Sequence, residues 1–211
     1  MLANLKISLL LVPLFLFFSS SSFSKNSEQI INEIESYFNN INTLQAKFIQ
    51  LDENGIYKSG TLMVAKPGKI RFDYNKPSSV LIVSDGEYVI FYDKKVEQLN
   101  RIHINKIPIQ FLLTNNFSFK KNNILIKNIQ FEGNVITLSI QYDKNVLTNK
   151  IKLLFESNPL ILRQWIVEDS QGYKTRISLE DINTDIKLDE KKFKFDYNRK
   201  FREINKTFLP N

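Results

Sequence analysis

The stretch from Gly60 to Pro77, GTLMVAKPGKIRFDYNKP, decides the fold. Its Pro-Gly pair fits the centre of a type II turn, because proline fixes φ and glycine tolerates a positive φ. After that pair, charged and apolar residues alternate strictly, in the order Lys69, Ile70, Arg71, Phe72, Asp73 and Tyr74. Successive side chains of a strand point to opposite faces. The stretch therefore predicts an antiparallel hairpin with one apolar face.

The same alternation of short runs and turns continues on both sides of this hairpin. Turn signals occur at Asn54-Gly55, Asp85-Gly86, Gly133-Asn134 and Gln171-Gly172. Glycine beside Asn or Asp permits the positive φ values that tight hairpins need. This pattern predicts an antiparallel meander, with strands over 43–52, 59–66, 69–75, 79–84, 87–93, 96–103, 123–132, 134–142, 150–157, 161–168, 173–180 and 192–196.

Two segments have a pattern that favours helix over strand. The first follows Ser27, a residue type that caps helices, and its apolar residues recur at helical spacing, namely Ile30, Ile31, Ile34, Tyr37, Phe38 and Ile41. The second is the very apolar segment 105–116, with Pro108 near its start, where a helix tolerates proline. We predict an amphipathic helix from Ser27 to Ile41 and a short helix over 105–116.

No repeat, linker or low-complexity tract divides the chain after its first residues. The simplest architecture is one mainly β (α+β) domain, in which a single antiparallel sheet bends round one or two helices. A closed barrel would remove the sheet edges, whereas a partly open barrel capped by helices would leave an internal apolar space. A tightly filled core explains the same pattern, and the pattern alone does not exclude it.

The first 24 residues have the pattern of a secretory signal peptide. Lys6 precedes an apolar run from Ile7 to Phe18, and Ser22-Phe23-Ser24 offers small residues at the cleavage positions. The run is shorter than the roughly 20 apolar residues of a transmembrane helix. We therefore expect export, cleavage after residue 24 and one mature domain over 25–211.

The chain contains no cysteine and has a formal net charge of +7. An exported protein without cysteine has no disulfides, and it lacks the residue that carries the lipid of a bacterial lipoprotein. The lysines are scattered among asparagines and do not follow one face. This pattern favours a compositional bias over a nucleic-acid or lipid surface, and export also argues against nucleic acid.

Residues that could perform catalysis or hold a metal are sparse. His103 is the only histidine, and its neighbours supply neither a carboxylate nor a second ligand, so neither zinc nor a Ser-His-Asp triad is indicated. The glycines form no nucleotide-binding loop and no Gly-x-Ser-x-Gly elbow. The acid pairs Glu168-Asp169 and Glu180-Asp181 fall at strand ends, where solvated turns explain them. We predict a binding protein without cofactor or metal, and not an enzyme.

Several short motifs follow one another in a fixed order. The Gly-led strand, basic-Pro turn and aromatic strand of residues 60–77 precede Ser84-Asp85-Gly86 and Phe91-Tyr92-Asp93. Further motifs are Phe48-x-Gln50 after the first helix, Pro108 with Phe111-Leu112-Leu113, and Asp189 before Phe193-x-Phe195. This ordered set, behind a signal peptide, resembles the outer-membrane lipoprotein carrier family (LolA-like) over essentially the whole mature chain.

The resemblance implies an incomplete antiparallel β-barrel, closed by short α-helices that form a lid over an apolar cavity. It also implies a periplasmic chaperone that shields the acyl chains of lipoproteins from water. Such a carrier accepts acylated lipoproteins from an inner-membrane ABC-type release complex and passes them to an outer-membrane receptor or to the outer membrane itself. The family carrier binds no cofactor, and we expect a monomer.

The resemblance also supports a set of candidate site residues. We expect apolar residues of the first helix and the next strands to line the acyl-chain cavity, namely Ile34, Phe38, Leu44, Phe48, Ile70, Phe72 and Tyr74. The lid would contain Ile109, Phe111 and Leu112. Lys66 stands where many members have an arginine that hydrogen-bonds the lid shut. Because lysine lacks the planar fork of donors, Arg71 is a second candidate for this latch. Ile70 also departs from the family, which often has an aromatic residue there.

Two other interpretations stay open. A periplasmic sensor or lipid-binding protein on the same half-barrel would bind one partner instead of many acylated ones, since fold alone does not determine function. A hydrolase of envelope polymers or lipids would need a clustered acid pair or a serine near His103. The related outer-membrane receptor is disfavoured, because it needs a lipidated cysteine and the chain has none.

Overall fold

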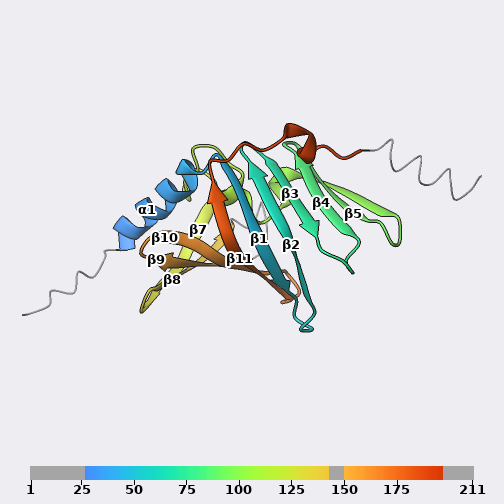
Figure 1. Ribbon diagram of the computed structural model, residues 1–211. Helices are drawn as coiled ribbons and strands as arrows, with labels where there is room; N and C mark the ends of the chain where they lie inside the picture. Colours follow the sequence, from blue (N-terminus) through green and yellow to red (C-terminus); the bar gives the residue numbers. More distant parts are fainter. Residues whose placement is uncertain (1–26, 143–149, 197–211) are drawn as a thin grey trace, which may run out of the picture.

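The main feature of the computed structural model, which describes residues 27–142 and 150–196, is one antiparallel sheet of 11 strands (Figure 1). The strands are β1 (Thr43–Leu51), β2 (Tyr57–Ala65), β3 (Lys69–Tyr74), β4 (Val80–Asp85), β5 (Tyr88–Asp93), β6 (Gln98–His103), β7 (Ile124–Glu132), β8 (Val135–Tyr142), β9 (Lys150–Ser157), β10 (Leu160–Glu168) and β11 (Lys174–Thr184). Each lies within a few residues of a predicted strand. The predicted signal peptide, residues 1–24, falls outside the described residues.

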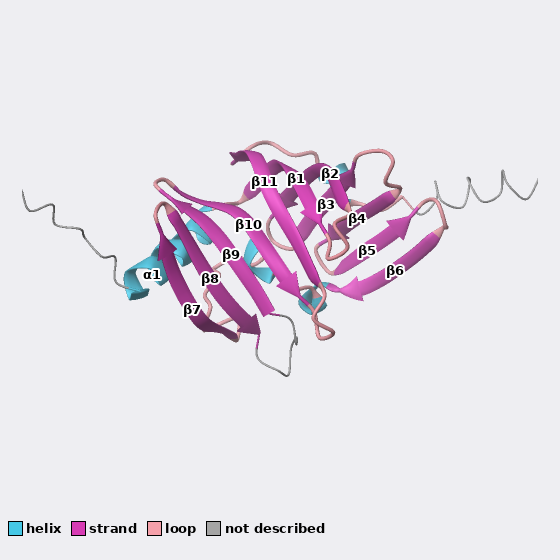
Figure 2. Ribbon diagram, turned by 90° about the horizontal axis from the view of Figure 1, so that it is seen from below, coloured by secondary structure: helices cyan, strands magenta, loops and turns pink. Residues whose placement is uncertain are grey.

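Two meanders make up the sheet. Its order is β6-β5-β4-β3-β2-β1-β11-β10-β9-β8-β7, so only β1 and β11 pair out of sequence. Their register places Phe48 opposite Leu179. The edge strands β6 and β7 do not pair with each other, and the sheet stays open (Figure 2). The prediction of an incomplete antiparallel barrel is therefore confirmed.

The hairpin of β2 and β3 forms as the quoted stretch predicts. Ala65 pairs with Lys69, which leaves a three-residue turn whose Gly68 has a φ of +72°. A Cβ on this glycine would lie 2.7 Å from the carbonyl oxygen of Gly86. The residue at 68 is thus restricted twice, by its positive φ and by the close approach of the next turn.

One amphipathic helix, α1 (Ser27–Asn40), covers part of the inner face of the sheet (Figure 1). Ile30, Ile34 and Phe38 recur at helical spacing and are fully buried, and burying each such side chain contributes about 2 kcal/mol. The Tyr37 hydroxyl accepts a hydrogen bond of 3.2 Å from the amide of Leu162 on β10. This helix agrees with the predicted one.

The predicted helix over 105–116 is wrong. The segment between β6 and β7, called the linker here (residues 104–123), contains two short 3₁₀ turns, η1 (Ile104–Lys106) and η2 (Gln110–Leu112). Pro108 lies between them and disfavours the α conformation of the residue before it; Ile107 is accordingly extended, with φ −93° and ψ 145°. Among the described residues only α1 is α-helical, so an irregular linker stands where a helical lid was expected.

The predicted last strand over 192–196 is also wrong. The chain forms a 3₁₀ turn there, η3 (Glu190–Phe193), and the Asp189 side chain caps it by accepting from the Lys191 amide. Phe193 is buried in a small second core with Met63. A side chain anchored on the face of the sheet holds the backbone away from a sheet edge, where a further strand would have to pair.

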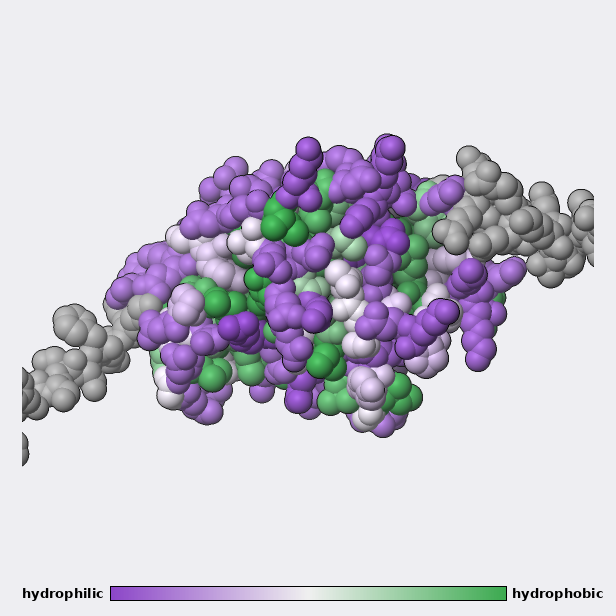
Figure 3. All heavy atoms as spheres, in the orientation of Figure 1, coloured by the Kyte–Doolittle hydropathy of each residue, from purple (hydrophilic) through white to green (hydrophobic). Residues whose placement is uncertain are grey.

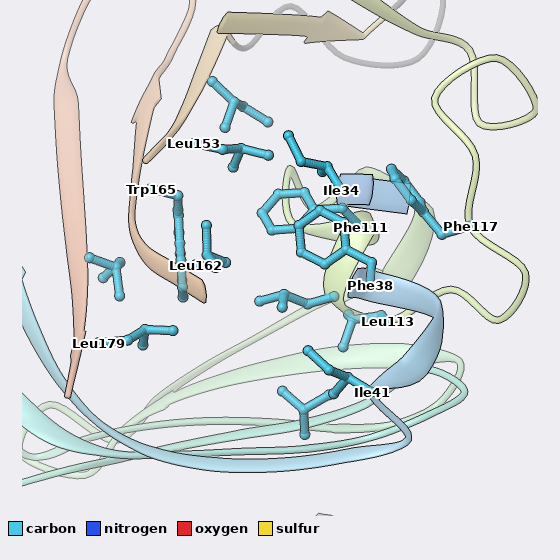
Figure 4. Close-up of a cluster of buried hydrophobic side chains, with 14 of the residues drawn as sticks. Ile34, Phe38, Ile41, Phe111, Leu113, Phe117, Leu153, Leu162, Trp165 and Leu179 are labelled. Carbon is cyan, nitrogen blue, oxygen red and sulfur yellow. The ribbon is translucent and has the colours of Figure 1, made fainter. Parts of the chain in front are cut away.

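Most apolar side chains pack in one core between the inner face of the sheet, α1 and the linker. Figure 4 shows Ile34 and Phe38 of α1 beside Phe111 of the linker, with Trp165 of β10 opposite. In the view of Figure 3 the outer surface is mostly hydrophilic, and apolar residues show only in small patches. The core therefore lies on the side of the sheet that α1 and the linker cover.

Candidate functional site

An apolar cavity of about 250 Å³ lies at the inner face of the sheet, beside the main core. Strands from both meanders and the linker contribute its walls, so the cavity spans the junction of β1 and β11. Its lining residues are Gln50, Ile70, Phe72, Tyr74, Ile82, Val89, Phe91, Ile107, Pro108, Ile109, Trp165, Val167, Thr175 and Ile177. None of them carries a charge.

The few polar side chains at this cavity are neutral, and two of them form a hydrogen bond with each other. The Tyr74 hydroxyl donates a hydrogen bond of 2.6 Å to Oε1 of Gln50. Burial raises the pKa of Tyr74 to about 12, because the low dielectric disfavours phenolate. The walls therefore stay uncharged at neutral pH, and what they offer a ligand is mainly aliphatic and aromatic surface.

The predicted cavity residues divide into two groups. Ile70, Phe72 and Tyr74 line the cavity itself. Phe48 lies behind them, and its ring packs edge-on against Phe72 at 5.1 Å and Tyr74 at 5.0 Å between centroids. Phe48 therefore buttresses this wall of the cavity.

Ile34, Phe38 and Leu44 do not line the cavity. All three are buried in the main core, and Phe38 contacts Phe111 of the linker at 5.2 Å between ring centroids. In the present state this group fills the space beneath α1. An occupant could reach it only after α1 or the linker had moved.

The three predicted lid residues also lie at different depths. Ile109 lines the cavity together with Ile107 and Pro108. Phe111 and Leu112 lie deeper and are fully buried, and the Phe111 ring faces Trp165 at 6.4 Å. The linker thus both closes the cavity and inserts its own apolar side chains into the core.

Lys66, the first latch candidate, contacts α1 and not the linker. Its Nζ donates a hydrogen bond to the carbonyl oxygen of Phe38 in the last turn of the helix. Burial lowers the pKa of Lys66 to about 8, because desolvation disfavours the ammonium. In the same turn, the Gly68 amide donates to the Leu113 carbonyl at 3.0 Å. The β2–β3 turn therefore touches both covering elements.

Arg71, the second latch candidate, lies on the outer face of the sheet. Its Nε donates to Asp73 at 2.7 Å, and its Nη1 donates to the carbonyl of Lys192 at 2.8 Å. Strand alternation turns it away from Ile70 and Phe72, which face the cavity. The structure does not bring Arg71 to the lid.

Further contacts hold the cover, and the sequence patterns did not single them out. Asn39 clamps Phe117 of the linker, donating from Nδ2 to its carbonyl at 2.9 Å and accepting from its amide at 2.6 Å. The Tyr142 hydroxyl donates to the carbonyl of Pro108 at 3.2 Å. Glu35 of α1 likewise accepts from the Phe119 amide at 2.8 Å. All of these are side chain to backbone bonds between distant segments, which no local sequence signal marks.

Within residues 27–142 and 150–196, no group of three or more His, Cys, Asp or Glu side chains is placed to hold a metal ion. In the same ranges no helix is both long enough and apolar enough to cross a bilayer.

Comparisons with known proteins show which family the sequence resembles. The family model described as "Outer membrane lipoprotein carrier protein LolA" matches residues 39–196. An outer-membrane lipoprotein carrier protein of Nitrosospira multiformis is 30% identical over 190 residues, which cover 86% of this chain and 89% of that protein. The carrier protein of Dechloromonas aromatica is 28% identical over 174 residues, which cover 78% of this chain and 82% of the relative.

Among solved structures, a LolA superfamily protein from Nitrosomonas europaea aligns with a TM-score of 0.45 and 12% identity, over 82% of this chain and all of that one. The family model spans β1 to β11, including the cavity walls and the linker. Membership also places the chain among binding proteins and not among enzymes. The chain belongs to the LolA family of outer-membrane lipoprotein carrier proteins.

Proposed function

We propose that the protein is a periplasmic carrier that encloses the acyl chains of lipoproteins in the cavity between the sheet and the linker. It takes acylated lipoproteins from an inner-membrane ABC-type release complex and delivers them to an outer-membrane receptor or to the outer membrane itself. The observation that carries this proposal is an uncharged apolar cavity whose cover is a short irregular segment. The predicted signal peptide supports the periplasmic location.

The size of the cavity supports a cover that moves when cargo enters. A volume of about 250 Å³ falls below the roughly 300–1,000 Å³ of ordinary small-molecule sites. An acyl chain therefore needs space that the linker now fills. The side chains that must move out of this space are Ile109, Phe111 and Leu112. We infer that these residues change partners between the empty and the loaded state.

The energetics favour such an exchange. Burying a methylene contributes about 0.8 kcal/mol, so one long acyl chain represents on the order of 10 kcal/mol. Cargo and linker compete for the same apolar walls, and the linker's own burial reduces the net affinity for cargo. A carrier needs this reduction, because it must release what it has bound.

Mass spectrometry of complexes purified from the periplasm tests the proposal. The expected result is co-purification of several different acylated proteins with the wild type. A variant with Phe72→Glu, which places a carboxylate in the wall, should lose them, whereas Phe131→Glu, at an exposed position on β7, should keep them. Recovery of one unacylated partner would instead support a sensor on the same fold and contradict the carrier.

A further inference from the structure

On the outer face of the sheet, this chain binds a segment of its own through a carboxylate, a backbone carbonyl and an apolar side chain. The strap, residues 186–196, crosses β3 and β4 on that face. Lys69 forms an ion pair with the Glu190 carboxylate, and Arg71 donates to the Lys192 carbonyl at 2.8 Å. Phe193, three residues after the acid, is buried against Met63.

Three features of the sheet hold the strap. A lysine and an arginine stand two residues apart on one strand, so both project from the outer face. An apolar side chain, Met63, lies directly opposite Arg71 on the neighbouring strand. The strap supplies the matching groups, namely a carboxylate, a backbone carbonyl and a large apolar side chain, within the four residues from Glu190 to Phe193.

The same three features recur on β11 without an occupant among the described residues. Lys174 and Arg176 have the same spacing and also point outward, because Thr175 and Ile177 line the inner cavity. Ile166 of β10 lies directly opposite Arg176. These side chains surround a groove of about 370 Å³ on the outer face.

The groove is strongly basic. Lys127, Lys150 and Lys152 also line it, and among the described residues that line it Glu168 is the only acid. Glu168 is already paired with Lys150 at 2.8 Å and lies 3.9 Å from Lys174.

The cationic side chains of Lys152 and Arg176, beside Ile166, are available to bind an anion. The side chains of Lys152 and Arg176 make no hydrogen bond or ion pair with any residue of the described ranges, and both residues are exposed. An arginine fork without a partner suits a carboxylate, which it can bind through two parallel bonds. The groove thus presents donors that an anionic partner can satisfy.

We propose that this outer groove is a docking site for an acidic segment of a partner protein. The segment presents a carboxylate to Lys152 and Arg176, and about three residues later a large apolar side chain that packs on Ile166. A protruding polypeptide fits better than a membrane surface, since the cations line a hollow that a flat bilayer cannot fill. The site lies on the face opposite the acyl-chain cavity and goes beyond the proposed carrier function.

Fluorescence anisotropy with a labelled peptide tests the site. The probe is Gly-Asp-Glu-Ser-Ser-Phe-Gly, and the control peptide has Asn and Gln in place of Asp and Glu. The wild-type chain should bind the acidic probe at least about tenfold more tightly than the amide control, and added salt should weaken the binding. The double variant Lys152→Glu, Arg176→Glu should lose at least about tenfold in affinity for the acidic probe.

A matched variant separates the site from net charge. Lys76→Glu with Lys187→Glu changes the charge equally at two exposed positions outside the groove, and it should keep the affinity within about threefold. An equal loss in both double variants, equal binding of the two peptides, or binding of phosphatidylglycerol vesicles without the peptide would overturn the proposal. Fatty-acid binding should be unchanged in both variants, so failure of the carrier function would show separately.

Discussion

The side-chain ammonium of Lys66 donates a hydrogen bond to the backbone carbonyl of Phe38. This contact joins the β2–β3 turn to the last turn of α1, close to the Asn39 clamp on the linker. Helix, turn and linker therefore form one connected cover over the apolar interior. Disturbing any of these contacts should change both the stability of the empty protein and its readiness to open.

The first prediction concerns pH. In the folded state the pKa of Lys66 is lowered to about 8 from an ordinary value of 10.5. Between these values the unfolded chain binds the extra proton, so the contribution of Lys66 to the free energy of unfolding rises as the pH increases from 8 to 10.5. Urea denaturation of wild type and Lys66→Met over this pH range should show that the free energy of unfolding of the wild type rises relative to that of the variant. A constant difference would contradict the buried ammonium.

Lys66→Arg provides a control for the same contact. Arginine keeps a donor but stays protonated throughout this range. The variant should therefore retain the connection to α1, but its free energy of unfolding should not rise with pH as that of the wild type does. If Lys66→Arg follows the wild-type slope, another group is responsible for it.

The second prediction concerns the Asn39 clamp. Asn39→Ala removes two hydrogen bonds from the backbone of Phe117 and leaves its amide and carbonyl without their partner. A loss of about 2 kcal/mol in the free energy of unfolding is expected. Hydrogen exchange at the Phe117 amide should accelerate more than exchange at the strand amides of β8. Unchanged exchange at Phe117 would show that the clamp does not hold the linker.

The third prediction separates a moving cover from a rigid core. Phe111 is fully buried, and Phe111→Ala should destabilise the empty protein by about 3–5 kcal/mol. If the linker competes with cargo, the same change should tighten the binding of a fluorescent fatty acid, because a weaker competitor occupies the walls. A rigid core predicts the opposite, with stability and fatty-acid affinity falling together.

The fourth prediction concerns the cavity wall. Phe72→Glu should lower the affinity for a fluorescent fatty acid by at least about tenfold, since an unpaired carboxylate in an apolar site is strongly unfavourable. Phe72→Leu keeps the wall apolar and should retain most of the binding. Circular dichroism of both variants checks that the sheet has formed. Equal binding by Phe72→Glu and Phe72→Leu would show that acyl chains do not contact this wall.

Sequence reasoning succeeded where local pattern determines structure. Period-two alternation placed Ile70, Phe72 and Tyr74 on one face, and these three line the cavity. The apolar stripe of α1 likewise predicted its buried residues. In both cases the spacing of side chains along one element decides which of them are buried.

Sequence reasoning failed where distant segments meet. Trp165 and Ile177 line the same cavity from β10 and β11, but the pattern of one strand does not say which strand it will face. The local pattern predicts a strand over 192–196 that includes Phe193, although the burial of Phe193 against Met63 on the outer face turns the chain there. The sequence offers Arg71 as a second candidate for the lid latch, but its side chain bonds the strap on the outer face, a contact that no local pattern marks.

Quenching of Trp165 tests the central claim most directly. Trp165 is the only tryptophan in the chain and lines the cavity, so its fluorescence reports on what enters. Titration with a dibrominated fatty acid should quench it saturably, and Phe72→Glu should abolish the effect. Absence of saturable quenching, while the same acid still binds the protein by equilibrium dialysis, would mean that acyl chains bind elsewhere and that the cavity is not the cargo site.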